Sequence, residues 1–140
     1  ALASHFNKST VMVDLDYQFG MVAKNLDLNT PYGIREVMEH PERGIDATLL
    51  ERMVVKYRDQ LNIMASPHEL RTLPTVPPEL VRDMIDVLRT RFDYVIVDLP
   101  HIWTPWTAAA IQAADKNLIV AQLWLRSVTH ASRLIKAWIE

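Results

Sequence analysis

Residues 94–100 read Tyr-Val-Ile-Val-Asp-Leu-Pro, and residues 11–16 read Val-Met-Val-Asp-Leu-Asp. Each stretch is an apolar run, rich in β-branched residues, that ends in a carboxylate. A strand that is apolar throughout is covered on both faces, which is typical of a parallel sheet between helices. In such sheets, ligands bind in the crevice beyond the carboxyl ends of the strands. We therefore expect Asp14, Asp16 and Asp98 to lie at the edge where an α/β protein does its chemistry.

The composition is that of an ordinary globular domain. The chain has 140 residues, of which 49% are hydrophobic and 23% are charged, and this length fits one domain with a single core. No apolar run approaches the roughly 20 residues that span a bilayer, and no signal peptide is visible. The absence of cysteine excludes disulfides and thiolate metal sites and agrees with a cytoplasmic protein. The net charge of −2 lacks the strongly basic character typical of nucleic-acid binding.

Turn and capping residues divide the chain into alternating strands and helices. Asp46 fits the N-cap of a helix, and Pro78 fits the first position of another, in which Leu80, Met84, Ile85 and Leu88 form an apolar stripe. Strands are expected at 10–15, 61–65, 93–98 and 116–122, and helices at 1–7, in short segments within 20–40, after 46, from 78, from 104 to about 114 and after Ser127. The last helix is expected to bury one face, formed by Val128, Ala131, Leu134, Ile135 and Trp138. This alternation predicts an α/β fold with a mostly parallel sheet and helices on both faces.

Three acids make the candidate site. Asp14 and Asp16 are two residues apart, so in an extended strand they would point the same way and reach one ion or one water. Asp98 is followed by Leu99-Pro100, which turns the chain out of the strand. A carboxylate in that position commonly binds magnesium, directly or through water. The alternative is that these acids only cap helices or hydrogen-bond turns, and the residues by themselves leave both interpretations open.

Other metal or nucleophile sites are not indicated. The five histidines are scattered and show no H-x-x-x-H or H-E-x-x-H spacing, which disfavours a zinc site. No G-x-S-x-G nucleophile elbow is present.

Residues 13–20 read V-D-L-D-Y-Q-F-G and resemble the V-D-x-D-x-Q-x-G segment of the MinD/ParA-type P-loop ATPases. Later segments are similar to the CpaE/TadZ branch of that superfamily, which is associated with tight-adherence (Flp) pilus assembly; they are residues 25–28, 61–67, 91–100 and 114–120. The similarity runs in order over nearly the whole chain. It implies a P-loop NTPase fold and an ATP-binding and ATP-hydrolysing scaffold or positioning protein for pilus assembly. Recruitment to a cell pole or to the inner membrane surface by pilus-assembly partners would follow from that role.

The resemblance also assigns roles to residues. Asp16 matches the switch I acid that orients the attacking water, Asp14 matches the acid of the same motif nearer the metal, and Asp98 matches the Walker B acid on magnesium. The turn that shapes switch I is matched by Gln18 and Gly20, and the start of switch II by Leu99, Pro100 and His101. ATP and Mg²⁺ are the implied cofactors, and a homodimer is implied when nucleotide is bound.

The chain departs from the family in one large respect. Its three glycines, Gly20, Gly33 and Gly44, do not form the phosphate-binding motif G-x-x-x-x-G-K-[ST]. Residues 1–140 are therefore expected to be a partial domain truncated at both ends, with the phosphate-binding segment upstream and an adenine-contacting segment downstream. Such a fragment alone is expected to be inactive, because that loop supplies most of the phosphate binding. The family's first strand would lie between the strands at 94–98 and 117–122, so its absence would leave a gap in the sheet.

Two other functions stay open. The protein could be a non-hydrolysing localisation or interaction protein of the same fold, and a glycine-rich loop upstream would argue against that. A ParA-like DNA-partitioning ATPase is disfavoured by the acidic balance. Trp103 and Trp106 flank Thr104-Pro105 beside switch II. Core packing is the default for tryptophan, and the alternative hypothesis is a partner surface that responds to the nucleotide state.

Overall fold

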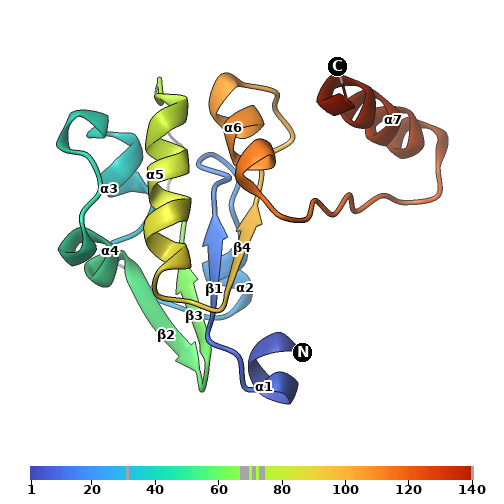
Figure 1. Ribbon diagram of the computed structural model, residues 1–140. Coiled ribbons are helices and arrows are strands. Elements are labelled where there is room, and N and C mark those ends of the chain that lie inside the picture. The colour runs from blue at the N-terminus through green and yellow to red at the C-terminus, as the bar shows by residue number, and fades with distance from the viewer. Residues whose placement is uncertain (31, 67–69, 71, 73–74, 140) are drawn as a thin grey trace.

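A four-stranded, mostly parallel sheet organises the chain (Figure 1). The computed structural model describes residues 1–30, 32–66, 70, 72 and 75–139. The strands are β1 (Thr10–Asp14), β2 (Val54–Arg58), β3 (Leu61–Met64) and β4 (Tyr94–Asp98), in the spatial order β2-β3-β1-β4. β1 runs parallel to both β3 and β4, and β2 pairs antiparallel with β3. The fold class expected from the sequence is confirmed.

Helices cover the sheet and connect its strands. They are α1 (Leu2–Phe6), α2 (Val22–Asn25), α3 (Arg35–Met38), the 3₁₀ turn η1 (Pro41–Arg43), α4 (Ala47–Met53), α5 (Pro78–Arg89), α6 (Pro105–Ala113) and α7 (Leu125–Ile139). In the view of Figure 1, α5 and α6 stand side by side in front of the sheet and α2 lies behind it. Asp46 caps α4 by accepting a hydrogen bond from the amide of Leu49, and Thr104 and Thr107 form a capping box at the start of α6.

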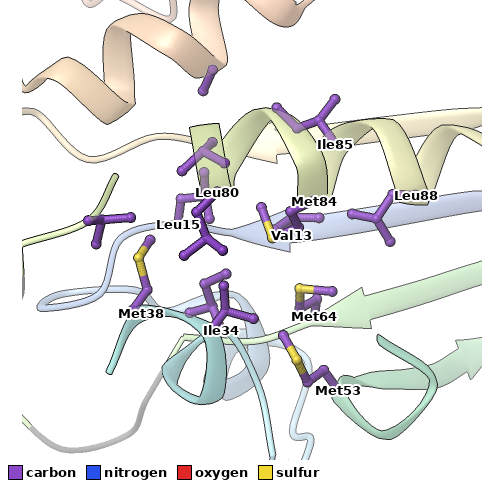
Figure 2. Packing of buried hydrophobic residues seen from close by; sticks show 14 of the residues in the cluster. Val13, Leu15, Ile34, Met38, Met53, Met64, Leu80, Met84, Ile85 and Leu88 are labelled. Atoms are coloured by element: carbon purple, nitrogen blue, oxygen red, sulfur yellow. The ribbon is translucent and has the colours of Figure 1, made fainter. Parts of the chain in front are cut away.

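The core lies between α5 and the sheet. Leu80, Met84 and Leu88 line one face of α5, at the spacing predicted from the sequence, and all are buried. Figure 2 shows these side chains above Val13 of β1, with Ile34 and Met64 on the opposite side of the cluster. Burying a side chain of this size stabilises the fold by about 1.5–3 kcal/mol. This cluster fixes the directions of β1, β3 and α5 and hence the sheet edge where the strands end.

Strand β2 was not predicted. Its sequence, Val-Val-Lys-Tyr-Arg, is rich in strand-forming residues and is separated from β3 by only Asp59 and Gln60. Asp59 has a positive φ of 28°, in a tight connection that joins the two antiparallel strands. The two-residue separation between apolar runs was therefore the available signal.

The strand predicted at 116–122 is wrong. Residues 114–124 form neither helix nor strand, and Leu118 and Val120 are 90% and 95% exposed. An extended segment becomes a strand only when its backbone groups find a neighbour, and in the described part of the chain nothing pairs with the outer edge of β4.

The expectations for the last helix are also wrong in two respects. α7 begins at Leu125, and Ser127 lies inside it, where its hydroxyl accepts a hydrogen bond from the amide of Gln122. None of the described residues of α7 is buried, so its apolar face is not part of the core. Figure 1 shows α7 standing apart from the sheet at the end of the extended linker. No helix in the described part of the chain is both long and apolar enough to cross a membrane.

Candidate functional site

The predicted acids gather at the carboxyl ends of two neighbouring strands. Asp14 is the last residue of β1 and Asp98 is the last residue of β4. The two residues are register partners in the parallel ladder, and the backbone amide of Leu15 donates to the carbonyl oxygen of Asp98 at 2.9 Å. Asp16 follows in the turn directly after β1. The sheet therefore brings together residues that are 82 to 84 positions apart in the sequence, as 98 − 16 and 98 − 14 give.

Asp14 is fully buried and its carboxylate accepts three hydrogen bonds. The amide of Asp16 donates to Oδ1 at 3.1 Å, and both the amide of Val22 and the hydroxyl of Ser66 donate to Oδ2 at 3.1 Å. Burial raises the pKa of Asp14, and the negative charge of Asp98 adds to that shift, whereas these three donors oppose it. Asp14 thus holds together β1, the start of α2 and the segment after β3.

Asp16 lies in a tight turn rather than in the strand. Because β1 ends at Asp14, the two carboxylates do not project side by side from an extended strand, as the sequence pattern suggested. The amide of Gly20 donates to the carbonyl of Asp16 at 2.8 Å, and the amide of Phe19 donates to Asp16 Oδ1 at 3.0 Å. The side chain of Asp16 therefore stabilises its own turn while remaining partly exposed at the sheet edge.

Asp98 is exposed at the same edge, and the charges around it define the electrostatics of the site. Partial burial of its carboxyl raises the pKa of Asp98, and so does the negative charge of Asp16, whereas His101 lowers it. The carboxylates of Asp16 and Asp98 thus repel each other across the ends of β1 and β4. A cation placed there would relieve that repulsion.

The residues predicted to form the two switches flank these acids. Gln18 and Gly20 lie in the turn after β1, and both are partly buried. Leu99 packs against the core, Pro100 is partly buried, and His101 is exposed. The structure places all five next to the acids that they were predicted to accompany, and their switch roles stay predictions.

The two tryptophans have different environments. Trp106 is 3% exposed and belongs to the core cluster, so its assignment to a partner surface is wrong. The capping box turns α6 so that Trp106, in its first turn, faces inward. Trp103 is 48% exposed, and Ile102 beside it is 38% exposed. Only Trp103 stays a candidate for a partner surface.

The residues fit Mg²⁺ held jointly with phosphate better than a metal enclosed by protein. Among the residues that the structure describes, no group of three His, Asp or Glu side chains is arranged to hold an ion. Mg²⁺ in phosphate-handling sites commonly takes one or two carboxylates, and phosphate oxygens and waters complete its shell. Asp98, which is exposed at the sheet edge and to whose carboxyl no described group donates a hydrogen bond, suits such a ligand. Three donors already bind the buried carboxylate of Asp14, so its effect on a cation would be mainly electrostatic.

Sequence reasoning missed two groups that support the turn. Ser66, two residues beyond the end of β3, donates to Asp14 as described above. On the other side, the buried Tyr17 donates its hydroxyl proton to Glu39, just after α3. The only available signal for Ser66 was its position after a buried strand, because strand ends at this sheet edge meet in space.

Comparison with known proteins finds similarity to septum site-determining proteins. No family model matches the chain. The chain is 26% identical over 136 residues to the septum site-determining protein MinD of Synechocystis; this match covers 96% of the chain and 50% of that protein. The chain therefore spans about half the length of this relative.

Solved structures give the same fold. A ParA family ATPase from Chlorobium tepidum superposes with a TM-score of 0.78 at 24% identity, covering 97% of this chain and 57% of that one. The septum site-determining protein MinD from Pyrococcus horikoshii, solved with Mg-ADP, gives a TM-score of 0.68 at 13% identity and covers 93% of this chain and 53% of that one. These likenesses confirm the MinD/ParA-like P-loop NTPase fold.

Proposed function

We propose that residues 1–140 form the part of a MinD/ParA-type ATPase domain that carries its acidic switch residues, and that the whole protein binds and hydrolyses ATP. The observation that carries this proposal is the register pairing of Asp14 with Asp98, which brings the acidic turn and the Walker B-like carboxylate to one sheet edge. The similarity to MinD and the fold shared with the Mg-ADP complex support it.

Each residue has a distinct task in this proposal. Asp98 would hold Mg²⁺ directly or through water, and Mg²⁺ when bound would neutralise charge on the phosphates. Asp16 would orient the attacking water, because its carboxylate lies at the edge and its backbone is held by the turn. Asp14 would add negative potential near the cation while holding that turn in place. Phosphate binding itself requires the glycine-rich loop, which residues 1–140 do not contain.

ATP turnover by the full-length protein tests the proposal. Substituting Asp16→Ala should abolish turnover, because the water loses the group that orients it. Asp83→Ala is the matched control, since Asp83 is an exposed acid on α5 outside the site. Unchanged turnover in Asp16→Ala would remove Asp16 from its role. A wild-type protein that binds ATP without hydrolysing it would favour the alternative, a positioning protein of the same fold.

We further propose that the protein serves pilus assembly as a CpaE/TadZ-like scaffold and dimerises when it binds nucleotide. The pilus role is supported by the similar segments 25–28, 61–67, 91–100 and 114–120. Dimerisation is supported by exposed apolar side chains beside both acidic strand ends: Phe19, Met21, Ile102 and Trp103.

Sedimentation of the full-length protein with and without Mg-ATP tests the dimer. Mg-ATP should increase the sedimentation coefficient, and Trp103→Ala should weaken that response without unfolding the protein. A monomer in both conditions would contradict the proposal. A DNA-partitioning role would instead require salt-sensitive DNA binding, which the net charge of −2 disfavours.

A further inference from the structure

Ser66 is a buried hydroxyl at the sheet edge that carries the acids. It follows β3, the strand that flanks β1 on the side opposite β4. The residue is 6% exposed, and its Oγ donates to Asp14 Oδ2 at 3.1 Å. A third strand end therefore reaches the site, by a group that carries no charge.

Gly20, at the end of the acidic turn, packs directly on this hydroxyl. A Cβ at Gly20 would lie 2.0 Å from Ser66 Oγ and 2.5 Å from both Ser66 Cβ and Asp14 Oδ2. Those distances are far below van der Waals contact, so only glycine allows the turn to approach this closely. Ser66, Asp14 and Gly20 thus form one packed unit, which we name the turn anchor.

The turn anchor connects Ser66 to Asp16 through hydrogen bonds. The Ser66 hydroxyl binds Oδ2 of Asp14, and Oδ1 of the same carboxylate accepts from the Asp16 amide at 3.1 Å. Rotation of the Asp14 carboxylate would break the bond to Asp16. A hydrogen-bond donor on Oδ2 opposes that rotation. Because the site is buried, water does not replace this hydrogen bond when the donor is removed.

We propose that Ser66 is a positioning residue that holds the Asp14 carboxylate in the orientation that fixes the backbone of Asp16. The effect of Ser66 on catalysis rests on the proposed function, because Asp16 orients the attacking water only if that function is correct. The effect of Ser66 on the turn is independent of that function and can be measured on the chain itself.

Ser66→Ala is the test variant, because it keeps Cβ in place and removes only the hydroxyl. Thr10→Val is the matched control. Thr10 is 1% exposed at the other end of β1, and its hydroxyl donates to the carbonyl of Lys8 at 2.9 Å. Both variants remove one hydroxyl donor from a buried residue at an end of the sheet, so a general loss of stability should be similar in the two.

Amide hydrogen exchange measured by NMR is the first readout. In Ser66→Ala, the amides of Asp16 and Val22 should exchange about three- to tenfold faster relative to the amides of β1, which matches the loss of one hydrogen bond. Thr10→Val should leave that ratio unchanged. An equal acceleration of all amides in Ser66→Ala, or none, would overturn the proposal. If Ser66→Ala does not fold, Ser66→Cys tests the same hydrogen bond, because its thiol is only a weak donor and should accelerate the same two amides.

Turnover of the full-length protein is the second readout. Ser66→Ala should lower kcat several-fold with KM for ATP unchanged, and Thr10→Val should alter neither. A raised KM with unchanged kcat would overturn the link to Asp16. If the wild-type protein shows no turnover, the proposed function fails, and the exchange result still decides whether Ser66 positions the turn.

Discussion

Replacing Asp14 with alanine should destabilise the fold strongly, although the substitution removes a buried charge. Two backbone amides and one hydroxyl donate to this carboxylate, and all three would lose their acceptor. A buried donor left unpaired costs about 1–3 kcal/mol, and the Ser66 hydroxyl can rotate, so the two amides together cost about 2–6 kcal/mol. The raised pKa of Asp14 indicates that the folded state disfavours its negative charge. Removing that charge therefore offsets part of the cost of the two unpaired amides. We expect a net loss of about 2–4 kcal/mol.

Urea unfolding of the 140-residue chain at pH 7, followed by circular dichroism, measures this loss, provided that the m-values of the variants agree. The unfolding free energy of Asp14→Asn should lie between those of the wild type and Asp14→Ala. The side-chain amide of asparagine keeps one oxygen that can accept a hydrogen bond, whereas its NH₂ group would face a donor. Asp98→Ala is the control at the register partner, since no described group donates a hydrogen bond to that carboxyl, and it should change stability by less than about 0.5 kcal/mol. An Asp14→Ala protein as stable as the wild type would refute the view that Asp14 holds the turn.

Four further outcomes are expected. Asp98→Asn should raise the thermal unfolding temperature slightly at pH 7, because the pKa of Asp98 is raised in the folded state and its ionised form therefore destabilises the fold above that pKa. The increase in unfolding temperature should fade as the pH falls towards about 4, and an increase that grows in acid would contradict this. Leu88→Ala should cost about 2–5 kcal/mol in urea unfolding, because Leu88 is fully buried on the inner face of α5; a cost below about 1 kcal/mol would mean that neighbouring side chains fill the cavity. Thr104→Ala should cost about 1 kcal/mol through loss of the capping box, and Thr104→Ser should restore most of it. Removing residues 118–140 should change the unfolding free energy by less than about 0.5 kcal/mol, since no described residue of α7 is buried; a larger loss would show that α7 packs on the domain.

The sequence predicts well whatever depends on local pattern and on the core. The spacing of Leu80, Met84 and Leu88 identified the buried face of α5, and Asp46 and Thr104 marked the starts of two helices. The apolar runs before Asp14 and Asp98 predicted both a parallel sheet and the meeting of the two acids. These features follow from periodicity and capping, which nearby residues determine.

What depends on distant partners was not predicted. The segment 116–122 has a strand-like composition but no neighbour along β4, so composition alone gave the wrong assignment. The environment of Asp14 depends on Val22 and Ser66, whose donors reach it only after the chain has folded. Trp106 is buried because the capping box directs it inward, while Trp103, three residues earlier, is not. Two identical side chains so close in sequence can be distinguished only by the geometry of the turn between them.

The outer edge of β4 affects how the 140-residue chain behaves in concentrated solution. In the described part of the chain, no strand pairs with it, and Tyr94 and Ile96 are 43% and 40% exposed. Such a row of free amides and carbonyls is a template on which any extended peptide can add. Preparations of the 140-residue chain should therefore associate increasingly as they are concentrated, and a short peptide that occupies this edge should keep them dispersed.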